Sequence, residues 1–234
     1  MTGGTRRESR SMTVEQAETM LAAAGVVWDE TASDYVFHPE RVTMPPMWAA
    51  YTVAAIMLGF RPGELAGLQW RFIDFGVATA SMRHAIKVGA GGRLVLAELK
   101  TKQSKRTLGM HPAVAAVLKW WRAAQAEDRL ALGAAYDASL ALVFADRVGR
   151  PLRRGTIRPA FNRECLKLIG ETFQLRETRH TFVSLLSHRG TSIEAISAAV
   201  GHKNSEITRK VYLHVLGDVV TTTATDWSRR TQTA

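Results

Sequence analysis

Apolar residues recur at helical spacing along most of the chain. Thr13 and Gln16 form a capping-box pair ahead of apolar positions 14, 17, 20, 21 and 24, which predicts a helix starting near residue 14. Residues 26–45 follow no clear period and are predicted to form a loop. Residues 47–58 are almost entirely apolar and therefore predict a buried helix.

The middle of the chain follows a different period. Apolar and polar residues alternate in RLVLAEL, residues 93–99, and glycines at 89, 91 and 92 mark a turn before it. A second strand is expected near residues 106–110. We therefore predict a small antiparallel sheet within residues 77–110.

Helical spacing returns after this sheet. Pro112 opens a helix with apolar positions 114, 117, 118 and 121 on one face, and a short strand is expected over residues 142–145. A helix over 156–169 should end at Gly170. A last helix should begin at a capping box formed by Thr191 and Glu194 and should end at Gly201. With a further helix over 178–188, the predicted class is α+β, mainly α, with a small antiparallel sheet on a helical core.

Composition narrows the classes of partner. The chain has 31 Lys and Arg against 21 Asp and Glu, a net charge of +10, which favours a polyanionic partner, although a solvated basic surface would give the same count. The single cysteine, Cys165, excludes a disulfide framework and shares a helical face with Phe161, which predicts a core position. The chain opens with no leader-like segment, and its longest apolar run is too short to cross a bilayer, so we expect a cytoplasmic protein.

One C-terminal stretch holds residue types that can displace an alcohol from a phosphodiester. Arg179 and His202 are followed by Tyr212, ten residues after the histidine. A tyrosine hydroxyl can attack phosphorus while the cations neutralise the phosphorane. Each residue alone has a plainer explanation as a surface cation, a capping histidine or a packing tyrosine. Their order and spacing favour the chemical interpretation.

Two upstream segments add further cations. In LGFRPGELAGL, Pro62 suits the first position of a helix and Glu64 the third, so Arg61 should leave from the helix entrance. In LKTKQSKRTL, the turn after the alternating strand is strongly basic, with Lys100, Lys102, Lys105 and Arg106 and no acid among them.

These segments together resemble the catalytic domain of the tyrosine recombinases, the phage integrase family, over residues 12–216. The resemblance implies that Tyr212 forms a 3′-phosphotyrosyl link and that the 5′-hydroxyl of a partner strand then attacks this link, without ATP, metal or another cofactor. It implies that Arg61 and Arg179 bind the phosphate and that Arg176 and His202 assist them. It also implies that Lys100 protonates the leaving oxygen, with Lys102 as the alternative. Glu64 is expected to support the site. We expect Lys102, Lys105, Arg106 and Lys203 to contact DNA.

The chain departs from the family at one position. The usual His-x-x-Arg is here Arg176-x-x-Arg179. A guanidinium stays protonated and cannot accept the tyrosine proton, but it can donate to a phosphate oxygen. We therefore expect Arg176 to stabilise charge, with water or His202 as the proton acceptor. His180, His202 and His214 lack a carboxylate or thiolate at ligand spacing, which argues against a metal site.

The expected organisation is a basic tail over 1–11, a catalytic domain over 12–216 and a polar tail over 217–234. The expected function is that of a site-specific recombinase or integrase, bacterial or phage-encoded and nucleoid-associated, acting on double-stranded DNA as a tetramer with other protomers. Two alternatives stay open: an accessory DNA-binding protein that has lost strand exchange, and a type IB topoisomerase. Family members usually carry a separate DNA-clamping domain before the catalytic one, so we expect either a fragment or a shortened relative.

Overall fold

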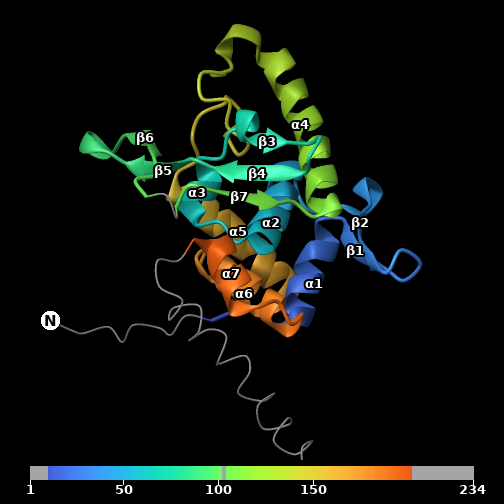
Figure 1. Cartoon of the computed structure of the whole chain (residues 1–234). Helices are drawn as coiled ribbons and strands as arrows, with labels where there is room; N and C mark the ends of the chain where they lie inside the picture. Colours follow the sequence, from blue (N-terminus) through green and yellow to red (C-terminus); the bar gives the residue numbers. More distant parts are fainter. Residues whose placement is uncertain (1–9, 102–103, 202–234) are drawn as a thin grey trace, which may run out of the picture.

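A computed structural model of the chain describes residues 10–101 and 104–201, which form a mainly helical body with small antiparallel sheets on it (Figure 1). This agrees with the predicted fold class. The helices are α1 (Val14–Ala23), α2 (Pro46–Leu58), α3 (Pro62–Ala66), α4 (Pro112–Leu132), α5 (Arg154–Ile169), α6 (Glu177–His188) and α7 (Ile193–Val200). Short 3₁₀ turns occur at η1 (Pro39–Arg41), η2 (Trp70–Phe72), η3 (Ala90–Gly92) and η4 (Gly133–Ala135).

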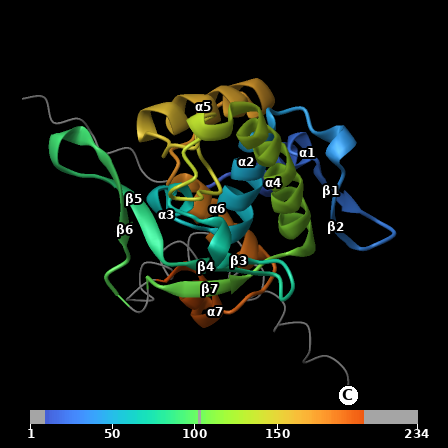
Figure 2. The same ribbon diagram turned by 90° about the horizontal axis from the view of Figure 1, so that it is seen from above.

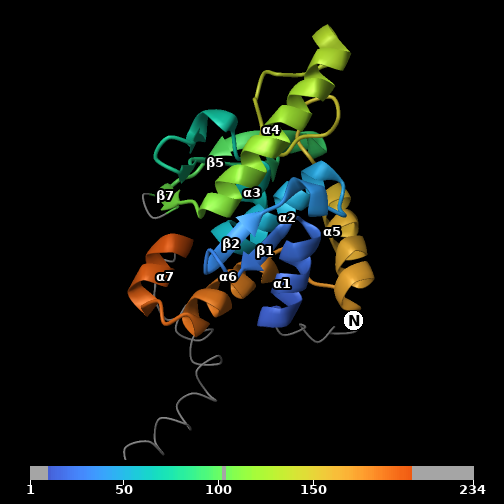
Figure 3. The ribbon, with the colours of Figure 1, turned by 90° about the vertical axis from the view of Figure 1, so that its right-hand side faces the viewer.

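Helix α2 lies at the centre of the body and carries no charged residue. It packs against α1, α4 and α6, as Figure 3 shows from the side. Its C-cap, Gly59, has φ +58, and a Cβ at this position would overlap the ring of Phe182 on α6. A glycine is therefore required both by the backbone conformation and by the close approach of α6 to the end of α2.

The strands form separate antiparallel units rather than the single sheet that the sequence predicts. One residue, Arg83, separates β4 from β5, and there the pairing partner changes from β7 to β6. The resulting β5–β6 hairpin projects away from the helices, on the left in Figures 1 and 2. The strands are β1 (Val26–Asp29), β2 (Asp34–Phe37), β3 (Ile73–Asp74), β4 (Thr79–Met82), β5 (His84–Val88), β6 (Leu94–Glu98) and β7 (Arg106–Gly109), in the sheets β1-β2, β3-β4-β7 and β5-β6.

The prediction of a loop over residues 26–45 is wrong, because β1 and β2 pair as a hairpin within it. Trp28 lies opposite Tyr35 with the ring centroids 5.4 Å apart, and Phe37 packs against Trp120 of α4. Four-residue strands are too short to display a period, and packing against α4 stabilises them. The Asp29 carboxylate closes the turn by accepting hydrogen bonds from the next backbone N–H groups.

Two smaller predictions are also corrected. Residues 142–145 form no strand: Leu142 bridges Gln69 and Ala145 bridges Pro151, with no ladder between them. The N-cap of α7 is Ser192 rather than Thr191, since the Ser192 hydroxyl accepts from the Ala195 N–H. Where two hydroxyl residues are adjacent, sequence alone does not select the cap.

The local signals for the other helices are confirmed. Thr13 and Gln16 form the capping box of α1, and Gly170 ends α5 in the left-handed conformation. Cys165 is fully buried in the main core. Phe182 and Val183 of α6 form a second, smaller cluster with α7. Among the described residues no helix combines the length and apolarity needed to span a bilayer.

Candidate active site

Arg61 leaves from the entrance of α3, as its sequence context predicts. It is the N-cap residue, with φ −66 and ψ 150, and Pro62 follows in the first turn. Its Nη1 donates to Oε1 of Glu64 at 2.7 Å, and its backbone N–H donates to Oε2 at 3.0 Å. Its side chain is 44% exposed. Glu64 thus holds Arg61 at both ends while leaving part of the guanidinium open to solvent.

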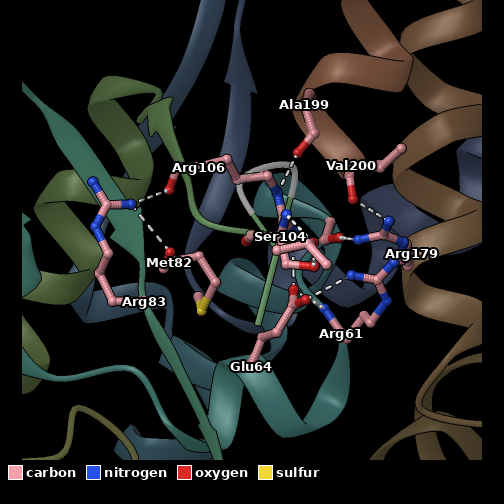
Figure 4. Close-up of polar contacts among 11 residues, drawn as sticks. Arg61, Glu64, Met82, Arg83, Ser104, Arg106, Arg179, Ala199 and Val200 are labelled. Carbon is pink, nitrogen blue, oxygen red and sulfur yellow. Dashed lines mark hydrogen bonds and ion pairs between the residues drawn. The ribbon is translucent and has the colours of Figure 1, made fainter. Parts of the chain in front are cut away.

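Glu64 itself is 2% exposed and serves a second arginine. Nη2 of Arg106 donates to its Oε2 at 3.0 Å (Figure 4). Burial raises the pKa of the Glu64 carboxyl, but the charges and hydrogen bonds of Arg106 and Arg61 outweigh burial, so the net shift is downward. The carboxylate is therefore ionised at neutral pH and bonds to both arginines.

Arg179 reaches the same cluster from α6. Its side chain is buried, with Nη1 donating to the Gly59 carbonyl at 3.0 Å and Nη2 donating to the Val200 carbonyl. Burial lowers the pKa of Arg179 to about 9, and the charges of Arg61 and Arg106 act in the same direction. Arg61 and Arg106 bond to the Glu64 carboxylate, and the charge of Arg179 acts on the same cluster without a bond to Glu64, so three cations face one anion and the cluster carries excess positive charge. A bound anion that carries one or two negative charges would offset this excess positive charge.

Arg106 is turned into the protein. It is 8% exposed, because the alternation of β7 turns Arg106 inward and Thr107 outward. Nε donates to the Ala199 carbonyl at 2.6 Å, Nη1 to the Ser104 carbonyl at 3.2 Å and Nη2 to Glu64. Three of the five N–H groups of this guanidinium are therefore bonded inside the protein. The expectation that Arg106 contacts DNA stays a prediction, and the contacts described here give the side chain a role inside the protein.

The basic turn after β6 is less uniformly positive than its own sequence suggests. Lys100 is exposed at its start. Lys105 is ion-paired with Glu98, an acid at the end of the preceding strand. The hydroxyls of Thr101 and Ser104 lie 2.8 Å apart and close the turn. Lys102 lies outside the described residues.

Arg176 sits at the N-cap position of α6 and is exposed. Its guanidinium makes no hydrogen bond or ion pair with another residue in the part of the chain that the structure describes. It lines a pocket of about 420 Å³ with Pro62 and Gly63 of α3. Arg176 therefore lies beside the entrance of α3 but is not tied into the Glu64 cluster.

The same pocket holds two cations that sequence reasoning missed. Lys87 of β5 and Arg154 of α5 line it together with Arg176. A signal for Arg154 was present, because residues 147–158 carry five arginines and no acid. Lys87 had no such signal, since only the pairing of β5 with β6 and its packing beside α3 place it there.

The remaining predicted site residues, His202, Lys203 and Tyr212, lie outside the described residues. The description ends at Gly201, directly after the Val200 carbonyl that Arg179 binds. Within residues 10–101 and 104–201 no group of three or more His, Cys, Asp or Glu side chains could hold a metal ion.

Comparison with known proteins finds one family model and several integrase relatives that match this chain. The family model described as "Phage integrase family" matches residues 11–217. An integrase of Streptomyces ambofaciens is 33% identical over 229 residues, covering 93% of this chain and 52% of the relative. The ICEBs1 integrase of Bacillus subtilis is 28% identical over 167 residues, covering 70% of this chain and 44% of the relative. The chain thus spans about half the length of the curated relatives it matches.

Solved structures share the fold. The Tn1549 transposon integrase, in complex with a circular intermediate DNA, superimposes with a TM-score of 0.65 at 18% identity, covering 90% of this chain and 63% of that one. XerA recombinase gives a TM-score of 0.63 at 17% identity, covering 94% and 66%. The family model, which spans nearly all of the described residues, establishes that this chain belongs to the phage integrase family of tyrosine recombinases.

Proposed function

We propose that this chain is the catalytic domain of a site-specific DNA recombinase of the integrase type, which cuts and rejoins DNA through a 3′-phosphotyrosyl intermediate. The observation that carries the proposal is the convergence of Arg61 and Arg179, from α3 and α6, around the buried Glu64 (Figure 4). This cluster has excess positive charge and a partly exposed guanidinium, which suits a phosphodiester. The integrase of Streptomyces ambofaciens, which matches over 93% of the chain, supports the same reaction class.

In the proposed reaction, the Tyr212 hydroxyl attacks phosphorus and the bond from phosphorus to the 5′ oxygen breaks. Lys100 gives a proton to that departing oxygen, and water or His202 takes the tyrosine proton. A 5′-hydroxyl of a partner strand then attacks the phosphotyrosine and releases Tyr212. Each step exchanges one phosphoester for another, so the bond energy is conserved and the reaction requires neither ATP nor metal.

The arginines are suited to stabilise the transition state. The phosphorane carries more negative charge than the diester, and fixed donors in a partly buried site favour it without reorganisation. Arg179 is fixed by two backbone carbonyls, and its guanidinium has further N–H groups to offer a non-bridging oxygen. Arg61 is fixed by the Glu64 carboxylate, which accepts from its guanidinium and from its backbone N–H. Arg176, at the rim, would add charge and a forked donor.

The proposed partner is double-stranded DNA. The net charge of +10 and the cations Lys87, Arg154 and Arg176 around one pocket suit a phosphate backbone. A solved relative of this fold is described in complex with DNA. Exchange between two duplexes needs four strand cleavages, so we propose that four protomers act together on DNA. Such a protein would act at the nucleoid of a bacterial cell.

Covalent capture tests this function. The chain is incubated with a duplex that spans the attachment junction of its mobile element and is nicked beside the expected cleavage position, so that the cut fragment diffuses away. A denaturing gel should then show a protein–DNA adduct that a scrambled duplex does not give. Absence of any adduct over a range of duplexes would contradict the proposal, and relaxation of a supercoiled plasmid lacking the junction would favour topoisomerase activity instead.

A further inference from the structure

Helix α7 ends beside the arginine cluster and is attached by a small apolar contact. Ile196 and Val200 pack against Phe182 and Val183 of α6, in a cluster separate from the main core. Two arginines bond to the last turn of α7: Arg179 donates to the Val200 carbonyl and Arg106 to the Ala199 carbonyl. The helix end is therefore held by hydrogen bonds from the same cations that surround Glu64.

Arg106 connects three segments that are far apart in sequence. From the first position of β7, its three nitrogens reach Glu64 of α3, Ala199 of α7 and Ser104 in the turn that follows Lys100 (Figure 4). Its guanidinium also lies over the Phe60 ring, 5.3 Å from the centroid. One planar group thus fixes the distances between the α3 entrance, the basic turn and the end of α7.

The chemistry of each contact favours arginine here. The last carbonyls of a helix lack partners within the helix and lie at the negative end of its dipole, so a buried cation stabilises them. A guanidinium presents donors in several fixed directions, whereas a lysine ammonium is a single point at the end of a flexible stem. Lysine at this position could meet one partner well but not all three.

The sharing of Glu64 links Arg106 to the phosphate-binding residue. Oε2 of Glu64 accepts from Arg106 and from the Arg61 backbone, while Oε1 accepts from the Arg61 guanidinium. Without Arg106, the carboxylate would lose a counter-ion inside the protein and would bind the Arg61 guanidinium more completely. Arg61 would then be less available to a phosphate, and the end of α7 would lose one of its two arginine contacts.

We propose that Arg106 is a positioning residue for strand cleavage. It touches no reacting atom. It acts through Glu64 on Arg61, through Ser104 on the turn that carries Lys100, and through Ala199 on the end of α7, after which His202 and Tyr212 follow in the sequence. This inference rests on the proposed function for its effect on rate, but the tie to α7 can be measured without DNA.

The test compares Arg106→Ala, Arg106→Lys and the matched control Arg83→Ala. Arg83 lies between β4 and β5, beside β7, and donates to the Met82 and Arg106 carbonyls, but it bonds to neither Glu64 nor α7. Hydrogen exchange followed by mass spectrometry should show exchange several-fold faster over residues 193–201 in Arg106→Ala, with α2 and α4 unchanged. Arg83→Ala should leave the α7 amides at the parental rate.

Single-turnover cleavage of the nicked attachment-site duplex at saturating protein gives the second readout. Misplaced reacting groups should slow Arg106→Ala by on the order of 10–100-fold, while DNA affinity stays within about threefold of parental. The cleavage rate of Arg106→Lys should lie between those of the parental chain and Arg106→Ala. Arg106→Lys is also the variant to use if Arg106→Ala does not fold. A purely structural role would instead lower the folded fraction and leave the rate per folded molecule unchanged.

Parental cleavage by Arg106→Ala, or α7 exchange equal to that in Arg83→Ala, would overturn the inference. If the parental chain forms no adduct at all, the proposed function fails, and the exchange data still decide whether Arg106 holds α7.

Discussion

At the scale of single residues, the three clustered arginines differ in how much donor capacity they spend inside the protein. Arg106 bonds through all three nitrogens and is buried. Arg179 uses two nitrogens on backbone carbonyls, and Arg61 uses one on Glu64 while its side chain stays 44% exposed. The number of nitrogens left to bind a ligand therefore rises from Arg106 to Arg179 to Arg61. Residue type alone could not predict this division, because it depends on strand alternation and on main-chain carbonyls from distant segments.

Arg176 provides a test of the departure from the usual family motif. If it donates to a phosphate oxygen, Arg176→Ala should raise the cleavage barrier by about 2–4 kcal/mol, as expected for loss of one preorganised donor. Arg176→Lys keeps the charge without the fork and should retain partial activity. Arg176→His should be active with an altered pH dependence, because imidazole titrates near neutrality. Single-turnover rates measure all three, with the exposed Arg129→Ala on α4 as the control. Equal rates in every variant would remove Arg176 from the site.

The role of Lys100 is tested by combining a change in the protein with a change in the leaving group of the substrate. Lys100→Ala should slow cleavage of ordinary DNA, because the 5′ oxygen departs poorly without a proton. A 5′-bridging phosphorothioate needs no such proton, so it should restore much of the lost rate. The matched comparison is Lys102→Ala. If Lys102→Ala shows this rescue and Lys100→Ala does not, the general acid is Lys102 and our assignment is off by two residues.

At the scale of secondary-structure elements, the site depends on how closely α6 approaches α2. The Arg179 contact to the Gly59 carbonyl exists only because α6 lies directly against the end of α2. Gly59 permits that approach, since any larger residue would overlap Phe182. The C-terminal glycine of a buried helix thus sets the position of Arg179, which we propose binds phosphate.

Gly59→Ala should therefore be more destabilising than a glycine replacement that only strains the backbone. Gly91 is the matched control, with φ +64 and no atom near a Cβ built on it. Gly91→Ala should cost about 1–2 kcal/mol from the left-handed conformation alone. Gly59→Ala should cost about 1–3 kcal/mol more because of the overlap with Phe182. Urea unfolding measures both, and equal losses would show that α6 adapts without strain.

Element boundaries were predictable where the determinants are local. The capping box at Thr13, Pro62 in the first turn of α3 and the left-handed Gly170 all act within a few residues. The β1–β2 hairpin and the change of pairing at Arg83 depend instead on contacts with distant partners. The spacing of His202 and Tyr212 stays a prediction from sequence, and the inward turn of Arg106 was not predicted because it depends on how β7 pairs with β4.

At the scale of the whole molecule, the positive charge is unevenly distributed. Cations gather where the start of α5, the β5–β6 hairpin and α3 meet, and Arg153 ties that hairpin to α5 by donating to the Gly92 carbonyl at 3.2 Å. The β1–β2 hairpin, which carries Asp29 and Asp34, projects on the opposite side in Figures 1 and 2. We propose on this basis that DNA approaches from the side of α3 and the β5–β6 hairpin, where the Arg61 side chain is partly exposed.

The most direct test of the account is to identify the residue that joins DNA. The adduct formed on the nicked attachment-site duplex is digested with nuclease and trypsin, and the phosphorylated peptide is sequenced by mass spectrometry. If Tyr212 is the nucleophile, the nucleotide will be found on Tyr212, and Tyr212→Phe will bind the duplex with parental affinity but form no adduct. An adduct on any other residue, or undiminished adduct from Tyr212→Phe, would contradict this assignment.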